Sequence, residues 1–379
     1  MFAFVVAAKV IRSFGYGLLS VAFALYLASA GFGPVAIGAI LSLALLAGAA
    51  FLTLSAPLVR KLGASATLVI AASAMCGAGA LLSLHDRPIA MIVACLFGTL
   101  SAGGQEVGPF AAIEQHAIAS STRTASSAHA FANYNLAGAF ALAFGALAAG
   151  AIATSSIPWA YASCGVALML LYAAMPAIDA PAPQVKGPVR VRFGTAERLA
   201  ALFGLDALAG GFVVQSFIAY WLHVRYGVDQ QMLAVVLFAA NTLSALSYPI
   251  AAWLSTKIGL LRTMVFTHLP SNVLLCIVPL MPTFASATAV LLARFALSQM
   301  DVPTRQAFAM EAVPESQRVH AAALTNAVRP AAAAVAPIFS GLSLATAAIG
   351  APFFIAGGLK IAYDLAIFNA FKRLRKPGG

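Results

Sequence analysis

Residues 12–27 read RSFGYGLLSVAFALYL, and a related stretch, DALAGGFVVQSFIAYW, recurs at residues 206–221. The two stretches share three identical residues in register: Gly17 with Gly211, Phe23 with Phe217 and Tyr26 with Tyr220. Other blocks recur at nearly the same interval: APLVRKLG at 56–63 with AWLSTKIG at 252–259, Glu106-Val107 with Asp301-Val302, and Asn133 with Asn326. Matches that run through both halves predict a chain built by internal duplication.

The composition places both halves in a membrane. Hydrophobic residues make up 62% of the 379 residues and charged residues only 9%, whereas charged residues are about a quarter of an ordinary soluble domain. The net charge of +11 would suggest nucleic acid as a partner of a soluble protein. Here the basic residues lie at the ends of apolar runs, so we expect membrane lipid and no nucleic acid as partners.

Apolar runs of spanning length indicate an all-α membrane protein with twelve transmembrane helices in two pseudo-symmetric six-helix bundles. The expected spans are 10–30, 35–58, 66–84, 88–112, 128–153, 157–178, 198–222, 232–255, 263–282, 285–310, 321–345 and 347–370. The segment 179–197 contains three prolines and three basic residues and no apolar run, which predicts a cytoplasmic linker. The predicted domains are therefore 1–178 and 198–379, with a short basic tail at 371–379.

The distribution of Lys and Arg predicts the orientation. If the amino terminus is inside, only Arg87 and Arg225 lie in outside loops. The inside loops then hold fourteen: Arg60, Lys61, Arg123, Lys186, Arg190, Arg192, Arg198, Lys257, Arg262, Arg318, Lys372, Arg373, Arg375 and Lys376. We therefore expect a multi-pass protein of the bacterial inner membrane with both termini in the cytoplasm. Residues 10–30 are interpreted as a retained helix, because removing them as a signal peptide would discard half of the best internal match.

Motifs for enzymatic chemistry are absent from the sequence. It contains no H-E-x-x-H, no G-x-S-x-G, no Gly-rich phosphate loop and no Cys/His cluster with metal spacing. The four cysteines all fall within predicted spans and form no C-x-x-C pair. We therefore expect neither an enzyme nor a bound cofactor or metal.

The loop between the second and third spans carries a family resemblance. Residues 56–65 read APLVRKLGAS, and the chain resembles the major facilitator superfamily, whose pattern there is G-x-x-x-D-[RK]-x-G-[RK]-[RK]. Lys61 and Gly63 match this pattern, whereas Ala56, Arg60, Ala64 and Ser65 differ. Together with the six-plus-six arrangement, the resemblance implies two bundles that open a central site alternately to each side. It suggests the bacterial efflux-type members, although residues 138–150 lack the Gly-Pro signature of their antiporters.

Ionisable residues within spans are costly, about 2.5–3.5 kcal/mol each on insertion scales, and they mark function. In the tenth span, Arg294, Asp301 and Arg305 are spaced by seven and four, which predicts one stripe along a single helical face, joined by Ser298. The stripe is either a substrate or proton site or a self-neutralising Asp301–Arg305 pair. The surplus Arg294 then requires a further partner or an anion.

Glu106, at the related position of the fourth span, has no basic residue one turn away in the sequence. A buried carboxylate without a local partner can exchange a proton near neutral pH, so Glu106 and Asp301 are the candidates for proton coupling. The alternative is that Glu106 pairs with Arg12 or Arg329 from another helix.

Arg12 and Asp206 occupy equivalent positions in the first and seventh spans. They predict an ion pair that closes the inner side, and the alternative is that each pairs within its own half, Arg12 with Glu106 and Asp206 with Arg305 or Arg329. By resemblance, Glu114 and Glu311 are expected to latch onto inner-loop cations. Those cations are Arg60 or Lys61 for Glu114, and Lys257 or Arg262 for Glu311.

Other polar residues complete the candidates. Lys360 and Asp364 are four apart in the twelfth span and predict a structural pair, while His268 is interpreted as a packing residue. Candidate ligands of a small molecule in the cavity are Arg12, Tyr16, Asn133, Asn135, Gln215, Asn241, Arg294 and Arg305.

These features predict a monomeric secondary transporter that exports a small solute, with protons as a candidate coupling ion. The alternatives are a uniporter or exchanger, an uptake permease for a small organic anion, and a lipid scramblase or membrane scaffold that transports no solute.

Overall fold

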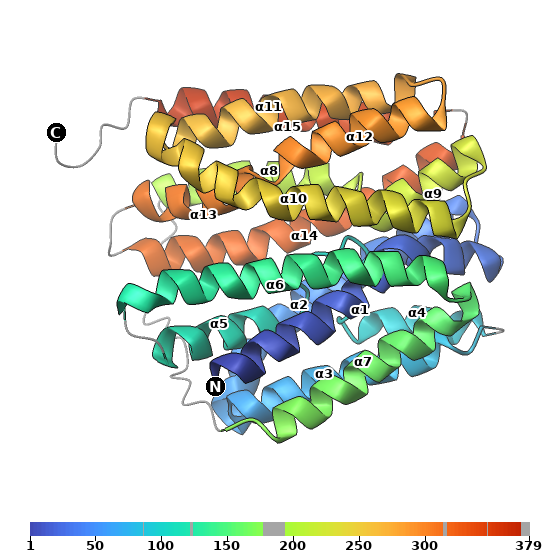
Figure 1. Cartoon of the computed structure of the whole chain (residues 1–379), viewed down its shortest axis with the longest axis horizontal. Coiled ribbons are helices and arrows are strands. Elements are labelled where there is room, and N and C mark those ends of the chain that lie inside the picture. Colours follow the sequence, from blue (N-terminus) through green and yellow to red (C-terminus); the bar gives the residue numbers. More distant parts are fainter. Residues whose placement is uncertain (86, 122–123, 177–193, 314–316, 347, 373–379) are drawn as a thin grey trace. The chain divides into compact units, whose positions relative to one another are not determined.

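The computed structural model describes the chain except residues 86, 122–123, 177–193, 314–316, 347 and 373–379, and it leaves out the side chains of residues 119–129, 318 and 319. The described residues form helices and contain no strand, so the all-α prediction is confirmed (Figure 1). Most of the expected linker and of the basic tail lies outside the described residues. So do Arg123, six further inside-loop cations and the side chain of Arg318.

Fifteen α-helices and two short 3₁₀ turns follow one another along the described chain. In the first part these are α1 (Phe2–Ser29), α2 (Pro34–Leu62), α3 (Ala64–Leu82), α4 (Pro88–Leu96), α5 (Phe110–Ser121), α6 (Thr124–Ala151), η1 (Thr154–Ser156) and α7 (Ile157–Ala173). The second part has α8 (Thr195–Gly211), α9 (Gln215–Tyr226), α10 (Gln230–Ile258), α11 (Leu260–Ile277), η2 (Val278–Leu280), α12 (Phe284–Ser298), α13 (Asp301–Glu311), α14 (Arg318–Ala345) and α15 (Ala351–Phe371).

Ten stretches of the described chain are long and apolar enough to cross a membrane, counting α8 with α9 as one. The other two predicted spans, 88–112 and 285–310, are each divided into two shorter helices, α4 with α5 and α12 with α13. The two divided spans are the fourth and the tenth, which the duplication relates to each other. The two halves therefore resemble each other in this respect also, since the corresponding span is interrupted in each.

The break in the tenth span has a local cause. α12 ends at Ser298 and α13 begins at Asp301, with Pro303 in the first turn of α13. Proline has no N–H to donate to the carbonyl of Gln299, and its ring collides with that carbonyl in a continuous helix. The prediction of one unbroken helical stripe from Arg294 to Arg305 is therefore wrong. Pro303 is the residue in the sequence that indicates the break.

The break in the fourth span is longer and rich in glycine. Gly98, Gly104 and Gly108 all have positive φ angles, between 66° and 70°, which glycine adopts without steric cost. The unwound backbone needs other hydrogen-bond partners. Tyr161 donates to the carbonyl of Thr99 (2.6 Å), and Tyr16 donates to that of Val107 (3.3 Å). Tyrosines of neighbouring helices thus hold the segment that carries Glu106.

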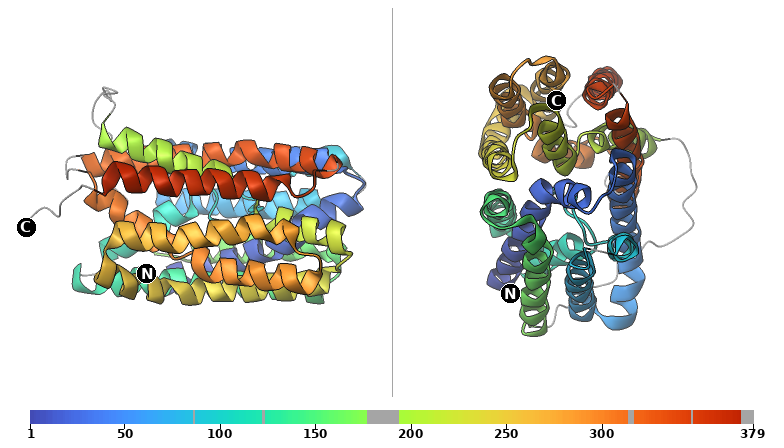
Figure 2. Two further views of the ribbon diagram at one scale, coloured as in Figure 1. Left: turned by 90° about the horizontal axis from the view of Figure 1, so that it is seen from above. Right: turned by 90° about the vertical axis from the view of Figure 1, so that its right-hand side faces the viewer.

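The chain forms two compact units. Unit 1 comprises Met1–Gln184 and Val214–Asn241, and unit 2 comprises Val185–Val213 and Thr242–Gly379. α9 and the beginning of α10 therefore group with the first half, where Ser216 donates its backbone N–H to the carbonyl of Ala102 (3.0 Å). Within unit 1, α1 packs against α6 and α3 against α7 (Figure 1). Within unit 2, α8 packs against α14 and α11 against α15, as long helices that lie side by side (Figure 2).

The repeated loop between the second and third spans has the same backbone in both units. Gly63 has φ 86° and ψ 166°, and Gly259 has φ 87° and ψ 159°. Both glycines end one long helix and begin the next. The Lys-x-Gly match of the sequence therefore has a physical basis, because a side chain at this φ would be strained.

Two repeated glycines allow close helix packing. A Cβ atom built on Gly17 would collide with the carbonyl of Leu142 in α6, and one on Gly211 would collide with the carbonyl of Ala333 in α14. Both obstacles are backbone atoms, which cannot turn aside as a flexible side chain would. Small residues at such positions let transmembrane helices approach closely.

Replacing Gly17 by Ala is accordingly expected to destabilise the protein by about 1–3 kcal/mol, the usual cost of overpacking. Thermal unfolding of purified protein in detergent would measure the change. Gly358→Ala is the matched control, since a Cβ there has open space and alanine favours the helix by about 1 kcal/mol. Equal transition temperatures for Gly17→Ala and Gly358→Ala would contradict this account of the packing.

Candidate functional site

A cluster of four charges lies inside unit 1 around Arg12. The Arg12 side chain, from α1, is completely buried. Its Nη1 and Nη2 donate to the two carboxylate oxygens of Glu114 at 2.7 and 2.8 Å, and its Nε donates to Glu106 at 3.1 Å. This fork-shaped pairing suits the planar guanidinium, which presents several N–H groups at once. Lys9, one turn earlier on α1, forms an ion pair with Glu106.

Two tyrosines complete the pairing of Glu114. Tyr134 of α6 donates to it at 2.6 Å and Tyr172 of α7 at 2.5 Å. Glu114 is fully buried. With the two bonds from Arg12, its two oxygens accept four hydrogen bonds. The expected latch between Glu114 and Arg60 or Lys61 is not formed in this structure, because both cations are exposed at the end of α2.

Glu106 differs from Glu114 in its access to solvent. Its side chain is 32% exposed, whereas that of Glu114 is 0% exposed. Its partners Lys9 and Arg12 come from a different helix, and the pair with Arg12 corresponds to the alternative expected for Glu106. The contact with Lys9 was not expected, and both partners are about one hundred residues from Glu106 in the chain.

Unit 2 contains a second cluster, centred on Asp206 of α8. Lys360 of α15 donates to one oxygen of Asp206 at 2.5 Å. Arg305 of α13 and Arg329 of α14 both donate to the other oxygen, at 2.9 and 3.2 Å. Asp206 is 3% exposed, so three cations from three helices converge on one buried carboxylate.

Asp301 extends this cluster. It is the first residue of α13 and accepts a hydrogen bond from Arg305 at 2.6 Å. Arg305 therefore bridges Asp301 and Asp206 through the same Nη1 atom. Arg294, on α12, is buried but takes no part in these ion pairs.

A histidine joins the same cluster from α11. His268 Nδ1 lies 2.8 Å from Asp364, and its Nε2 lies 3.9 Å from Asp206. Asn272 donates to the second oxygen of Asp364 at 2.9 Å. The predicted structural pair of Lys360 with Asp364 is therefore wrong, because the two side chains contact different partners, Asp206 and His268. The interpretation of His268 as a packing residue missed its place between two carboxylates.

Arg12 and Asp206 thus occupy the same position in the repeat with opposite charges. Each is the centre of a cluster in its own unit, Arg12 with carboxylates and Asp206 with cations. These contacts correspond to the alternative in which each residue pairs within its own half.

The remaining candidates are scattered. Tyr16 is buried, and Gln215 donates to Asn241 at 2.6 Å within unit 1. Asn133 and Asn135 are exposed on α6. Lys257, Arg262 and Glu311 are also exposed, and no ion pair joins Glu311 to either cation within the described chain. The proposed latch of Glu311 therefore stays a prediction.

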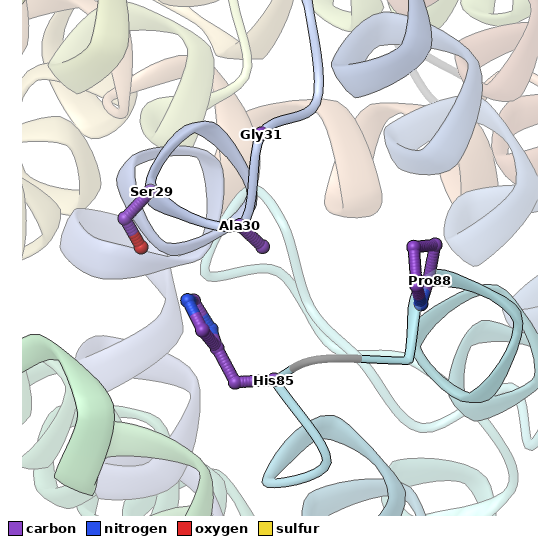
Figure 3. A pocket seen from close by; sticks show the side chains of 5 residues that line it. All are labelled: Ser29, Ala30, Gly31, His85 and Pro88. Carbon is purple, nitrogen blue, oxygen red and sulfur yellow. The ribbon is translucent and has the colours of Figure 1, made fainter.

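A separate pocket lies at one end of unit 1. It has a volume of about 340 Å³ and is lined by Ser29, Ala30, Gly31, His85 and Pro88 (Figure 3). Ser29 is seventeen residues from Arg12 on α1, or about 25 Å at 1.5 Å per helical residue. This pocket is therefore distinct from the charge cluster.

Comparison with known proteins identifies the architecture. Residues 5–337 match the family described as the Major Facilitator Superfamily. The chain belongs to this superfamily. The expected fold is confirmed, and the superfamily is one of membrane solute transporters.

Several relatives share the superfamily fold over nearly their full lengths. The yeast (Saccharomyces cerevisiae) membrane protein YJR124C is 21% identical over 414 residues, which cover 96% of this chain and 92% of the relative. The nucleoside transporter NupG is 14% identical with a TM-score of 0.75, covering 99% of each chain. The D-xylose–proton symporter is 13% identical with a TM-score of 0.75, covering 97% of each chain. The TM-scores of the two transporters show that they share the fold of this superfamily member, and identities this low say nothing about its substrate.

Proposed function

We propose that this protein is a secondary transporter that moves a small solute by alternating access and couples that movement to protons through Glu106. The observation that supports coupling is the unequal exposure of two carboxylates in one cluster. Glu106 is reached by solvent, while Glu114 is sealed among Arg12, Tyr134 and Tyr172. A coupling group must exchange its proton with water, so Glu106 is the residue of the pair that is placed to do so.

Protonation of Glu106 would change the net charge of the four-residue cluster around Arg12. Deprotonated, the cluster has two cations, Lys9 and Arg12, and two carboxylates. A proton on Glu106 leaves one cation without a counter-charge in a membrane interior, where an unpaired charge is costly. The cluster must then rearrange. Proton binding is in this way linked to the conformation of α1, which carries both cations.

The test is proton movement in proteoliposomes that contain a pH-sensitive dye. The panel includes drugs, organic anions and metalloids, together with a nucleoside and D-xylose, which are substrates of the fold relatives. Wild-type protein is expected to give a substrate-dependent pH change with one of these compounds. Glu106→Gln is expected to abolish that change and to retain substrate binding, because glutamine cannot release a proton but preserves the shape of the side chain.

Asp229→Asn is the control, since Asp229 is exposed and is not in the cluster. It is expected to transport as the wild type does. Saturable substrate flux without a pH change in wild type and variant alike would refute proton coupling and leave a uniporter or exchanger. Solute-independent lipid movement would instead favour the scramblase alternative.

We further propose export as the direction of transport, in a bacterial inner membrane with cytoplasmic termini. The asymmetry of Lys and Arg between alternate loops supports the orientation, and the resemblance to efflux-type members supports the direction. Uptake of substrate by inside-out vesicles, with none by right-side-out vesicles, is the result expected for an exporter.

A further inference from the structure

Arg294 is a buried cation with no ion-pair partner among the described residues. The residue is 7% exposed, and its Nε has no hydrogen-bond acceptor among the described residues. No described carboxylate lies within the 4.0 Å of an ion pair from its guanidinium. Arginine cannot be neutralised by losing its proton in a protein. The charge of Asp206 acts on Arg294 from beyond ion-pair distance, but Asp206 is already paired with three other cations. The guanidinium therefore has room for a further partner.

The charge balance of unit 2 leads to the same conclusion. Arg294 and the cluster around Asp206 together contain four cations, Arg294, Arg305, Arg329 and Lys360, against three carboxylates, Asp206, Asp301 and Asp364. The Arg329 side chain is 27% exposed, whereas Arg294 is buried. The cluster of unit 1, by contrast, is balanced, with two cations and two carboxylates. Of these two groups of described residues, the one in unit 2 has a surplus of one positive charge.

A second unsatisfied group lies one helical turn from Arg294. Ser298, on the same face of α12, is 5% exposed, and its hydroxyl has no hydrogen-bond partner among the described residues. Ser247 and Thr304 of unit 2 donate to nearby carbonyls, those of Ser244 and Met300. Thr242, Ser271 and Thr288, like Ser298, have no hydrogen-bond partner among the described residues. Of these four hydroxyls, Ser298 is the one that lies one turn from Arg294 on the same face of α12. A buried polar group normally has a partner.

The position of Arg294 along its helix favours a soluble ligand over a lipid. Arg294 is ten residues from the start of α12, or about 15 Å at 1.5 Å per residue. That is about half of a hydrocarbon layer of roughly 30 Å, a depth at which lipid headgroups do not lie. The guanidinium also stacks 4.9 Å from the ring of Phe295, which holds it in a fixed orientation.

We infer that Arg294 and Ser298 bind the oxyanion of a transported organic anion, a carboxylate or a phosphate. The guanidinium supplies paired N–H donors of the geometry that such groups accept, and the Ser298 hydroxyl supplies a third. The bound anion neutralises the surplus charge of unit 2. This inference rests on the proposed transport function and assigns its substrate class, but its test measures binding and requires no transport.

The test compares Arg294→Met with wild type in thermal unfolding of detergent-purified protein, in a buffer of constant chloride. The probes are benzoate and glycerol 3-phosphate, with benzamide and glycerol as uncharged counterparts. One of the two anions is expected to raise the transition temperature of wild type, and its uncharged counterpart is not. Arg294→Met is expected to weaken binding of that anion at least 100-fold, and Arg294→Lys and Ser298→Ala at least 10-fold.

The same experiment separates a ligand-binding arginine from a structural one. Without added anion, Arg294→Met is expected to unfold at a higher temperature than wild type, because the variant lacks an uncompensated buried charge. Arg329→Met, the matched control, removes a paired arginine and is expected to unfold at a lower temperature.

Three outcomes would overturn the inference. They are equal anion binding by Arg294→Met and wild type, stabilisation of wild type by neither anion, and stabilisation only by micelles doped with phosphatidylglycerol, which would indicate a lipid. Failure of proton coupling in proteoliposomes, with anion binding intact, would refute only the proposed coupling through Glu106.

Discussion

Replacing Asp206 by Asn is expected to lower the free energy of unfolding by about 3–5 kcal/mol, the usual cost of removing one partner from a buried ion pair. The physical reason is the set of three cations, Lys360, Arg305 and Arg329, which converge on this carboxylate. Asparagine keeps the shape of the side chain but leaves the three charges with Asp301 as their nearest remaining counter-ion. The measurement is the thermal transition of purified protein, together with the monodisperse fraction on size-exclusion chromatography.

Asp364→Asn serves as the matched control for this prediction. Its contacts are His268 and Asn272, and neither carries a permanent charge, so we expect a smaller loss. Lys360→Met added to Asp206→Asn is expected to recover part of the lost stability, since two groups in direct contact are not additive. A transition temperature of Asp206→Asn equal to that of wild type would show that the cluster contributes nothing to folding.

Replacing Arg12 by Met is expected to be destabilising to a similar extent, again about 3–5 kcal/mol. Arg12 is the only cation that contacts Glu114 among the described ion pairs, and Glu114 is completely buried. Arg12→Lys should rescue little, because one ammonium group cannot replace the fork that serves Glu114 and Glu106 together. Adding Glu114→Gln to Arg12→Met is expected to restore most of the stability, since both charges of the pair are then absent.

A charge exchange between the two clusters gives a sharper result. Arg12→Asp and Asp206→Arg are each expected to lose folding and transport, and the double variant is not expected to regain either. The aspartate introduced at position 12 would lie beside Glu106 and Glu114. The arginine introduced at position 206 would lie beside Lys360 and two other arginines. Recovery in the double variant would instead support the direct inner-gate pair between Arg12 and Asp206.

Several features of the site were accessible to sequence reasoning. The repeat marked Arg12 and Asp206 as equivalent positions, and the tenth span showed that Asp301 and Arg305 are one helical turn apart. The break between α12 and α13 was also encoded, because Pro303 cannot continue a helix through Gln299. These features depend on short stretches of chain, in which spacing translates directly into geometry.

The pairing of charges between helices was not accessible in this way. Lys360 contacts Asp206 across 154 residues of sequence, and His268 contacts Asp364 across 96. Such contacts depend on how far each helix is rotated about its axis and shifted along it, and a single sequence does not specify either quantity. For Glu106, the sequence left a pair with Arg12 or Arg329 as an alternative, and only the structure shows that its partners are Arg12 and Lys9.

The sequence by itself determined that this is a duplicated, all-helical membrane protein, because apolar length and the repeat are properties of the chain read in order. Only the tertiary structure decided which charges neutralise one another and which do not. It placed Arg12 among carboxylates and Asp206 among cations, and it left Arg294 without a counter-charge among the described residues. Side-chain packing between helices makes that choice, since a charge in a membrane interior must be matched by whichever group the fold brings within reach.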